Sequence, residues 1–318
     1  MTSPAPAPVP ASDDGGERMP RRRELVVAIN PAAGFGASRG VGTQVVAALR
    51  NHGHGVVALQ AASLAELVEA TRLALVGRPD ALVVVGGDGM VNFGAGLLVG
   101  SDIPLGIIAC GTGNDLARGL GLPLNKPDVA VEALLESLDR GGRVIDAVRV
   151  TSASGERRWF AGALSAGFDA IVNERANAMR RPRGKSRYIL ALLIELVRLR
   201  PIRYRLVLDG EELTTDALLV SVGNNVSIGG GMKVTPNAVM DDGLLDILVV
   251  RPLSRLAFLR IFPRVFAGTH LTDPRVSIHR ARTVRIEADS VVAYADGERF
   301  GPLPLELEVS EGVLRVLA

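Results

Sequence analysis

The sequence predicts an α/β protein in two parts, a parallel sheet flanked by helices and then an antiparallel β-sandwich domain. From Leu25 to about Asp146, short runs of β-branched residues alternate with helical segments. That rhythm requires parallel strands joined by right-handed crossovers. After about Arg143, short strand candidates are joined mainly by turn signals, which is typical of a sandwich.

In the first part, four short apolar runs predict buried strands. Between the second and third runs, Ser63 and Glu66 form a capping-box signature, which predicts a helix that continues to about Val76. Ligands of such sheets bind at the carboxyl ends of the strands, so the loops that follow the strands are the expected site. The predicted strands span residues 25–29, 55–59, 81–85 and 104–108.

In the second part, the pattern predicts seven strands and two amphipathic helices. The helices are expected near residues 186–200 and 253–267. The predicted domains are a disordered extension over residues 1–23, an α/β domain over 24–147 and a sandwich over 148–318, whose C-terminal segment can pack back on the first domain. The strands are expected at residues 144–150, 159–163, 203–208, 217–222, 244–250, 284–288 and 291–294.

Composition excludes several classes of protein. Charged residues make up 22% of the chain and hydrophobic residues 47%, as in globular proteins. A net charge of only +2 argues against a nucleic-acid partner bound by a broad basic face. A single cysteine, Cys110, excludes an internal disulfide framework and a multi-cysteine metal site, which fits the cytoplasm.

No targeting or membrane-spanning segment is expected. Residues 1–18 lack a secretory signal, and we hypothesise that Met19 is the true start because the first strand follows closely. The longest apolar stretch, Tyr188 to Leu199, is about half a membrane span and contains Glu195 and Arg198. Any membrane contact is therefore expected to be peripheral.

Three glycine-rich loops follow three of the predicted strands. Glycine allows backbone N–H groups to approach a phosphate closely, and each following helix offers a partly positive N-terminus. Together the loops predict a cradle for a polyphosphate, whereas any one of them alone is as well explained by a tight turn. The loops span residues 30–34 (NPAAG), 86–90 (GGDGM) and 111–115 (GTGND).

Two of these loops contain an aspartate, Asp88 and Asp115. A carboxylate beside a phosphate is repulsive unless a cation lies between them, so the pair indicates Mg²⁺ carried in by a nucleotide. The alternative is that both aspartates only cap helices. No GxxxxGK[ST] loop is present.

Six motifs occur in an order that identifies a family resemblance: NPAAG, GGDGMVN, GTGNDLAR, GNNVSIGGGM, PNAVMDDGLLDI and ADGE. From Leu25 to its C-terminus the chain resembles the soluble bacterial lipid kinases of the diacylglycerol kinase catalytic family. The resemblance implies a Rossmann-like nucleotide-binding domain, a β-sandwich and an active site in the cleft between them. It also implies transfer of the γ-phosphoryl group of ATP, with Mg²⁺, to a lipid hydroxyl, first of all that of diacylglycerol, which gives phosphatidic acid.

The same resemblance implies roles for individual residues. Asp88, Asp115 and Asp146 would hold the nucleotide's Mg²⁺ partly through water, and Asp242 would ligate a second, structural cation with the main-chain carbonyls of Val239 and Leu244. ATP would contact the glycine loops at Asn30, Gly86, Gly87, Asp88, Gly89, Met90, Asn92, Gly111, Thr112, Asn114 and Asp115.

Asp296 and Glu298 of the ADGE motif would sit at the reacting hydroxyl. A carboxylate within hydrogen-bond reach can take the proton of this poor nucleophile, and the sequence does not decide which of the two does so. Taken alone, the Asp-Gly pair is better explained by a surface hairpin turn.

The chain departs from the family pattern at Met90, Phe93 and Ala33, where potential phosphate contacts are lost. A kinase for another lipid, such as a sphingoid base, ceramide or polyprenol, stays open because the acceptor pocket leaves no readable motif. So do an NAD kinase, as a weaker alternative, and a nucleotide-responsive lipid-binding protein without catalysis.

The expected partner is a lipid presented at a membrane surface, with no nucleic acid, and a homodimer is left open. Arginines flank the helix near residues 186–200, which suits an interfacial helix at the inner face of the membrane. An ordinary core-facing helix with a solvated basic rim explains the pattern slightly better. We expect His270 to be a solvated surface imidazole.

Overall fold

The computed structural model describes residues 21–30, 40–179, 181 and 185–318. The N-terminal extension was expected to be disordered over residues 1–23. Residues 1–20, including the hypothetical start at Met19, lie outside the described residues. The first glycine loop also lies outside them, apart from Asn30, and with it the departure at Ala33.

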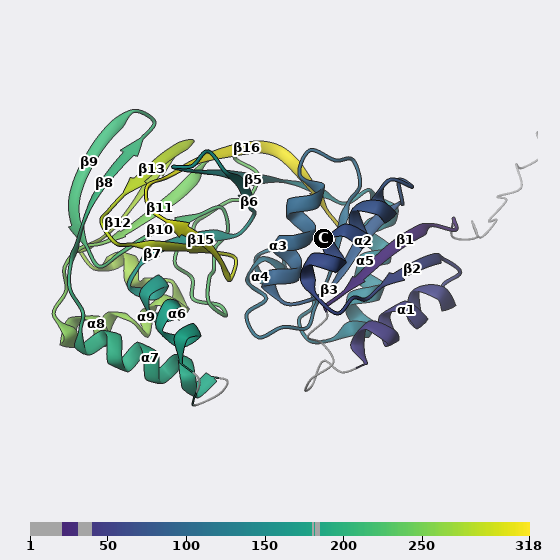
Figure 1. Ribbon diagram of the computed structural model, residues 1–318, viewed down its shortest axis with the longest axis horizontal. Helices are drawn as coiled ribbons and strands as arrows, with labels where there is room; N and C mark the ends of the chain where they lie inside the picture. Colours follow the sequence, from purple (N-terminus) through teal and green to yellow (C-terminus); the bar gives the residue numbers. More distant parts are fainter. Residues whose placement is uncertain (1–20, 31–39, 180, 182–184) are drawn as a thin grey trace, which may run out of the picture.

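The N-terminal domain contains the predicted parallel sheet, in the order β2-β1-β3-β4 (Figure 1). Helices α1 and α5 pack on one face through Val45, Leu49 and Leu134, whereas α2 and α3 pack on the other. The strands are β1 (Glu24–Ile29), β2 (Gly55–Leu59), β3 (Ala81–Gly86) and β4 (Leu105–Ala109), and the helices are α1 (Val41–Asn51), α2 (Leu64–Leu75), α3 (Asp88–Leu98), α4 (Asp115–Gly119) and α5 (Pro127–Arg140).

Local sequence signals explain where these elements begin. Ser63 caps α2 by accepting a hydrogen bond from the Glu66 N–H at 3.3 Å, as the capping box predicts. Both α3 and α4 begin at an aspartate that directly follows a glycine-rich loop. The N-termini of these two helices therefore lie at the carboxyl ends of β3 and β4.

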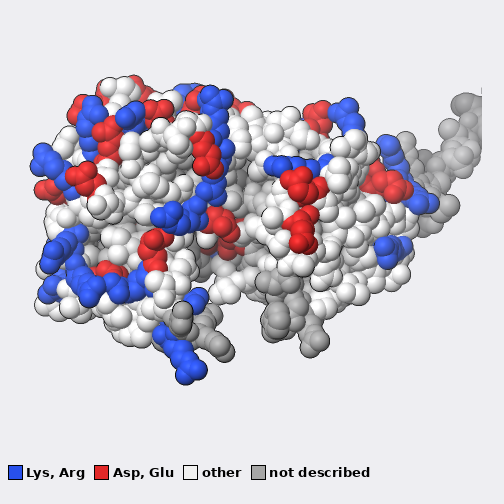
Figure 2. Space-filling model, viewed as in Figure 1, with Lys and Arg blue, Asp and Glu red and all other residues white. Residues whose placement is uncertain are grey.

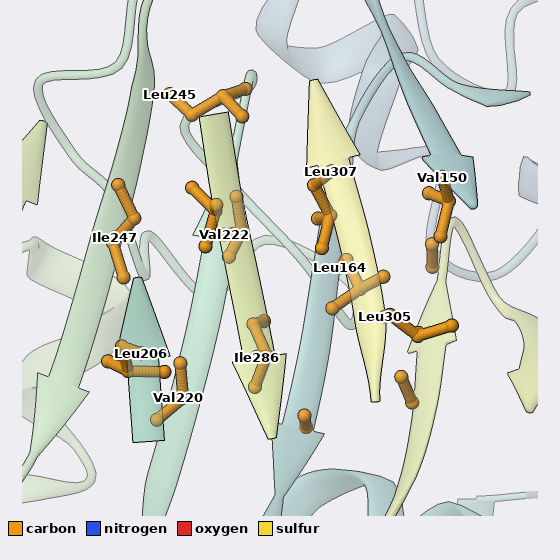
Figure 3. Packing of buried hydrophobic residues seen from close by; sticks show 14 of the residues in the cluster. Val150, Leu164, Leu206, Val220, Val222, Leu245, Ile247, Ile286, Leu305 and Leu307 are labelled. Carbon is orange, nitrogen blue, oxygen red and sulfur yellow. The ribbon is translucent and has the colours of Figure 1, made fainter. Parts of the chain in front are cut away.

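The C-terminal domain is the predicted antiparallel sandwich. Its first sheet has the order β12-β11-β10-β7-β14-β15, and its second is formed by β5, β6, β8, β9, β13 and β16. Apolar side chains such as Leu164, Val222 and Leu307 fill the space between the sheets (Figure 3). The strands are β5 (Arg143–Ser152), β6 (Arg157–Phe160), β7 (Ala163–Gly167), β8 (Ile202–Leu208), β9 (Glu211–Ala217), β10 (Leu219–Gly223), β11 (Leu245–Val250), β12 (Val276–Ala281), β13 (Thr283–Glu287), β14 (Val292–Ala295), β15 (Glu298–Pro302) and β16 (Leu305–Val316).

The last strand, β16, joins the two domains. It pairs with β5 and β13 of the sandwich, and Val316 continues beside Leu105 of β4 in the parallel sheet. The N–H of Leu317 also donates to the carbonyl of Leu105 at 2.9 Å. One continuous sheet thus runs from β2 to β9, which fixes the cleft between the domains.

The helices of the C-terminal domain lie together beside the first sheet of the sandwich (Figure 1). The helix predicted near residues 186–200 is α7 (Lys185–Val197), whereas the segment 253–267 forms two helices, because Pro263 interrupts it. Nowhere in the described part of the chain is a helix both long and apolar enough to cross a membrane. The remaining helices are α6 (Phe168–Ala178), α8 (Arg255–Ile261), α9 (Arg264–Ala267) and the 3₁₀ turn η3 (Thr269–Thr272).

Candidate active site

Asp88 joins the second and third glycine loops. Its Oδ2 accepts a hydrogen bond from the Asn114 N–H at 2.8 Å, and its Oδ1 accepts one from the Asp115 N–H at 2.6 Å. Burial raises the pKa of the Asp88 carboxyl, and the nearby Asp115 carboxylate acts in the same direction. The structure therefore brings both loops and two acidic side chains to one point.

The glycines of these loops approach each other so closely that side chains would not fit. A Cβ placed on Gly111 would lie 2.4 Å from Cα of Gly87, and one placed on Gly113 would lie 2.3 Å from Oδ2 of Asp88. Only glycine permits this contact between backbones. The edge of the sheet at β3 and β4 is thus lined by main chain. The N-terminus of α4 already holds the Asp88 carboxylate, and the N-terminus of α3 suits an anionic ligand.

Glu298 reaches the same point from the other domain. A Cβ placed on Gly89 would lie 2.9 Å from Oε1 of Glu298, and one placed on Gly297 would lie 3.9 Å from Cβ of Asp88. Asp296 and Gly297 form a tight turn with φ values of 47° and 82°. This turn between β14 and β15 places Glu298 over the start of α3, across the cleft from Asp88.

Asp296, two residues earlier, is held differently. Its carboxylate accepts three backbone hydrogen bonds at 3.0–3.1 Å, from the N–H groups of residues 161–163. Desolvation raises the pKa of the Asp296 carboxyl to about 6, despite these hydrogen bonds. Asp296 therefore fixes the turn that carries Glu298, and its oxygens already have partners within the protein.

Asp115 and Asn225 connect the two domains below the cleft. The Asp115 carboxylate accepts hydrogen bonds at 2.8 Å from the N–H groups of Gly230 and Gly231, and the Asn225 side chain donates to the Asp115 carbonyl at 3.0 Å. Asn224, which is also fully buried, donates to the carbonyls of Asp146 and Ala161.

Asn224 and Asn225 belong to the GNNVSIGGGM motif, but the sequence alone predicted no role for these two residues. The signal was present, because two adjacent amides at the end of a buried strand need partners. Asn225 finds its partner in the N-terminal domain, whereas the partners of Asn224 lie in β5 and between β6 and β7 of the sandwich. Asn225 therefore links the two domains, and Asn224 fixes the sandwich side of that link.

Two other residues that were expected to contact the nucleotide, Met90 and Asn114, have side chains that stabilise the N-terminal domain itself. Met90 is buried in the apolar core of the N-terminal domain, and its N–H donates to the Gly87 carbonyl. The side chain of Asn114 closes its own loop through two hydrogen bonds of 3.0 Å to Gly111. Asn92 lies within α3, while Thr112 is exposed at the tip of its loop.

The Asp146 carboxylate has backbone partners of its own. Its two carboxylate oxygens accept the N–H groups of Gly243 and Gly312, each at 2.8 Å. Within the described residues, no group of three or more His, Cys, Asp or Glu side chains is arranged to hold a metal ion. Asp146 therefore holds backbone groups of two other segments and is not gathered with Asp88 and Asp115 as direct ligands of one ion, whereas its expected contact through water stays a prediction.

The expected second cation site also has protein partners. Asp242 accepts a hydrogen bond from the Leu244 N–H and forms an ion pair with Arg280. The side chain of Val239 is exposed. Arg280 thus supplies, from β12, the positive charge that a cation was expected to supply.

His270 was expected to be a solvated imidazole, and this expectation is wrong. The residue is only 1% exposed, and its Nε2 lies 3.2 Å from the carbonyl of Val234. Burial lowers the pKa of the imidazole. The apolar helix preceding the Gly-Thr-His turn folds over it, which the turn residues alone did not indicate.

Taken together, the cleft has the parts of a phosphoryl-transfer site: main chain at the glycine loops and at the N-terminus of α3, and acidic side chains from both domains. Two family descriptions divide the chain in the same way. The diacylglycerol kinase catalytic domain matches residues 24–150, and the YegS C-terminal NAD kinase beta sandwich-like domain matches residues 162–318.

Individual relatives agree with this division. The chain is 42% identical over 305 residues to a diacylglycerol kinase of Mycobacterium tuberculosis, covering 93% of this chain and 96% of the relative. It is 26% identical to a diacylglycerol kinase of Bacillus subtilis, over 71% of this chain and 74% of that one. The chain therefore belongs to the diacylglycerol kinase catalytic domain family and is a lipid kinase.

Solved structures confirm the fold. A putative diacylglycerol kinase from Bacillus anthracis superposes with a TM-score of 0.73 at 24% identity, covering 93% of this chain and 97% of that one. An NAD kinase from Archaeoglobus fulgidus in complex with ATP gives a TM-score of 0.53 at 14% identity, covering 93% of both chains. At these identities the likeness concerns the fold alone.

Proposed function

We propose that this lipid kinase transfers the γ-phosphoryl group of ATP to the free hydroxyl of diacylglycerol, which gives phosphatidic acid. The observation that carries the proposal is the meeting of the two domains at the cleft, where Glu298 approaches Gly89 and the adjacent Gly297 approaches Asp88. A site of this kind needs one domain to hold the phosphates and the other to present a base to the acceptor. The substrate is suggested by the relatives named diacylglycerol kinase.

The glycine loops suit the triphosphate. Gly87, Gly111 and Gly113 leave main chain rather than side chains at the edge of the sheet. The N-terminus of α3 points its backbone toward the same place, and the partial positive charge there favours phosphate. Positioning and charge neutralisation are the main requirements of phosphoryl transfer.

The acidic side chains suit a nucleotide-bound Mg²⁺. Asp88, Asp115 and Glu298 offer hard oxygen donors, the type that Mg²⁺ prefers. In Asp88 each oxygen accepts one backbone hydrogen bond, so lone pairs remain. When bound, Mg²⁺ would neutralise charge on the transferring phosphoryl group.

Glu298 is the better candidate for the base that takes the hydroxyl proton. Asp296 uses both oxygens on three backbone donors, whereas Glu298 accepts no hydrogen bond from a described residue. Asp296 is then a positioning residue, which holds the turn and keeps Glu298 facing Gly89.

The test is a transfer assay with labelled ATP, Mg²⁺ and a panel of micellar lipids comprising diacylglycerol, a sphingoid base, ceramide and a polyprenol, with NAD as a further acceptor. We expect label on diacylglycerol above all. Preferred labelling of another lipid would overturn the substrate assignment, and label on NAD would overturn lipid acceptance. ATP binding without transfer to any acceptor would favour the non-catalytic alternative.

A further inference from the structure

Helices α7, α8 and α9 carry an exceptional share of the exposed apolar side chains. Among the described residues, twelve large hydrophobic side chains are exposed, and six of them lie on these three helices. Single exposed hydrophobics are normal, but a gathered set marks an interaction surface. The six are Leu190, Leu193, Val197, Leu256, Leu259 and Phe266, and Leu256 is 81% exposed.

The three helices form one continuous surface, here called the α7–α9 face. Arg255 at the start of α8 donates to the carbonyl of Val197 at the end of α7 at 2.6 Å. Phe258 and Phe262 stack within α8 and its C-terminal turn, and Phe262 contacts Phe266 of α9 edge to face. Figure 1 shows α7 and α8 side by side at the base of the sandwich domain.

The charge around this face has one sign. Residues 251–272 contain four arginines and no acid, and residues 190–203 contain the single acid Glu195, which is buried and paired with Arg175. Figure 2 shows blue side chains gathered at the lower left, over α7 and α8. In the described part of the chain, no carboxylate pairs with the exposed cations Arg198, Arg200, Arg203 and Arg260.

An apolar cavity lies directly beneath the face. Leu192 of α7 and Phe258 of α8 line it from one side, and Leu248 and Val250 of β11 line it from the other. A surface that only stabilised the fold would bury its leucines toward this cavity, whereas Leu193 and Leu256 point away from it and are exposed. The outward leucines therefore need a different partner.

We propose that the α7–α9 face docks on a bilayer that contains anionic phospholipid. The exposed leucines, Val197 and Phe266 would enter the boundary between headgroups and acyl chains, while the surrounding arginines would contact anionic headgroups. The proposal rests on the proposed function for its purpose, since a lipid kinase must take its acceptor from a membrane. Charge complementarity distinguishes a bilayer from a second copy of this chain, whose identical face would bring arginines against arginines.

The experiment is co-sedimentation of the full chain with vesicles of phosphatidylcholine alone or of an equal mixture with phosphatidylglycerol. We expect binding to the mixed vesicles, weaker binding to phosphatidylcholine and a decrease with salt. Leu193→Ser with Leu256→Ser should reduce binding by roughly tenfold or more, because two apolar side chains no longer enter the bilayer. Each of Arg198→Glu and Arg260→Glu should reduce it by at least roughly fivefold.

Matched changes on the N-terminal domain serve as controls. Leu73 is 74% exposed on α2 and Arg78 is exposed just after it, so Leu73→Ser and Arg78→Glu have the same chemistry at another place. These variants should bind vesicles as the unchanged protein does. Unchanged thermal unfolding of all variants excludes a folding defect.

A kinase assay separates this proposal from the proposed function. With a short-chain diacylglycerol in detergent micelles, the α7–α9 variants should keep their activity, whereas with diacylglycerol in mixed vesicles they should lose it in proportion to binding. Equal vesicle binding by all variants would overturn the docking face, whatever the kinase result. If the protein did not bind vesicles but sedimented as a dimer that Leu256→Ser dissociates, the face would be assigned to a second copy. Vesicle binding without phosphoryl transfer would contradict only the proposed function.

Discussion

The protein has two acidic regions that the sequence presented alike, and the fold treats them in opposite ways. In the cleft, Asp88 and Asp115 are held by backbone N–H groups, and Glu298 faces them from the other domain. At the Asp242 loop, Arg280 pairs with the carboxylate directly. In the first region the carboxylates meet only neutral backbone donors among the described residues, whereas in the second the protein supplies a cation, Arg280, which also lies 3.8 Å from the buried carboxylate of Asp246.

This difference indicates which region needs a ligand. Backbone amides orient a carboxylate without cancelling its full charge, so the cleft is ready for a cation that arrives with a polyphosphate. Burial raises the pKa of Asp88 there, which reflects the cost of charge without such a cation. At the Asp242 loop an added cation would have to displace Arg280.

Asp88→Asn is expected to have the largest effect. The change removes the central charge and places an amide donor against the N–H of Asn114 or Asp115. We expect transfer to decrease by about 10³-fold, in the range of a lost electrostatic group, and more Mg²⁺ to be needed for half-maximal rate. Initial rates at varied Mg²⁺ concentration measure both the rate of transfer and the Mg²⁺ requirement. Asp102→Asn, at an exposed position, is the control. A change in the KM for lipid alone would contradict a role of Asp88 in binding Mg²⁺.

Gly111→Ala tests the close approach of the loops. Its Cβ would lie 2.4 Å from Cα of Gly87, so the backbone must shift. We expect about a 10²-fold loss of activity through misplaced phosphate contacts. Gly96→Ala on α3 is the matched control, since its Cβ would meet nothing within 4 Å and alanine favours a helix. Equal activity of the two variants would show that the enzyme tolerates a separation of the two loops.

Asp296→Asn tests the anchor of the turn through pH. The folded pKa of Asp296 is about 6 against 3.8 for the free group, so the folded state holds its proton more tightly. Its contribution to stability is complete below about pH 3.8 and is lost as pH rises through about 6, on the order of 3 kcal/mol in all. Thermal unfolding curves of Asp296→Asn should therefore lack the decrease in stability with rising pH, although the lost hydrogen bonds lower the stability of the variant at every pH. Glu69→Gln is the control. If the stability of Asp296→Asn fell with pH as steeply as that of Glu69→Gln, the assignment would be contradicted.

Arg280→Met should have the smallest effect. Removal of a half-exposed ion pair costs about 1 kcal/mol or less, and it leaves Asp242 without its cation. We expect Mg²⁺ or Ca²⁺ to raise the melting temperature of this variant more than that of the unchanged protein. An equal response of both would mean that Arg280 does not occupy the place of a cation.

The sequence predicted most of the fold because its signals were local. The runs at residues 25–29 and 81–85 and the cap at Ser63 are read from a few neighbouring residues, and they are confirmed as β1, β3 and α2. Strand β16 was missed, although its residues alternate, because its partners β4, β5 and β13 are set by long-range pairing. The break at Pro263 was also missed, since amphipathic periodicity continues across it.

The site was predictable as a set of loops but not as a set of contacts. Glycine spacing indicated where Asp88 and Asp115 would lie. The ADGE and DDG motifs could not show that the Asp296 carboxylate accepts hydrogen bonds from residues 161–163 or that Arg280 pairs with Asp242. These partners come from distant parts of the chain. Which carboxylate is left for chemistry is therefore decided by the tertiary structure.

The most direct test compares Glu298→Gln with Asp296→Asn in single-turnover transfer from ATP to micellar diacylglycerol, with nucleotide binding measured alongside. If Glu298 is the base, Glu298→Gln should bind ATP normally and transfer about 10²- to 10⁴-fold more slowly, whereas Asp296→Asn should lose less. Normal transfer by Glu298→Gln would contradict the account.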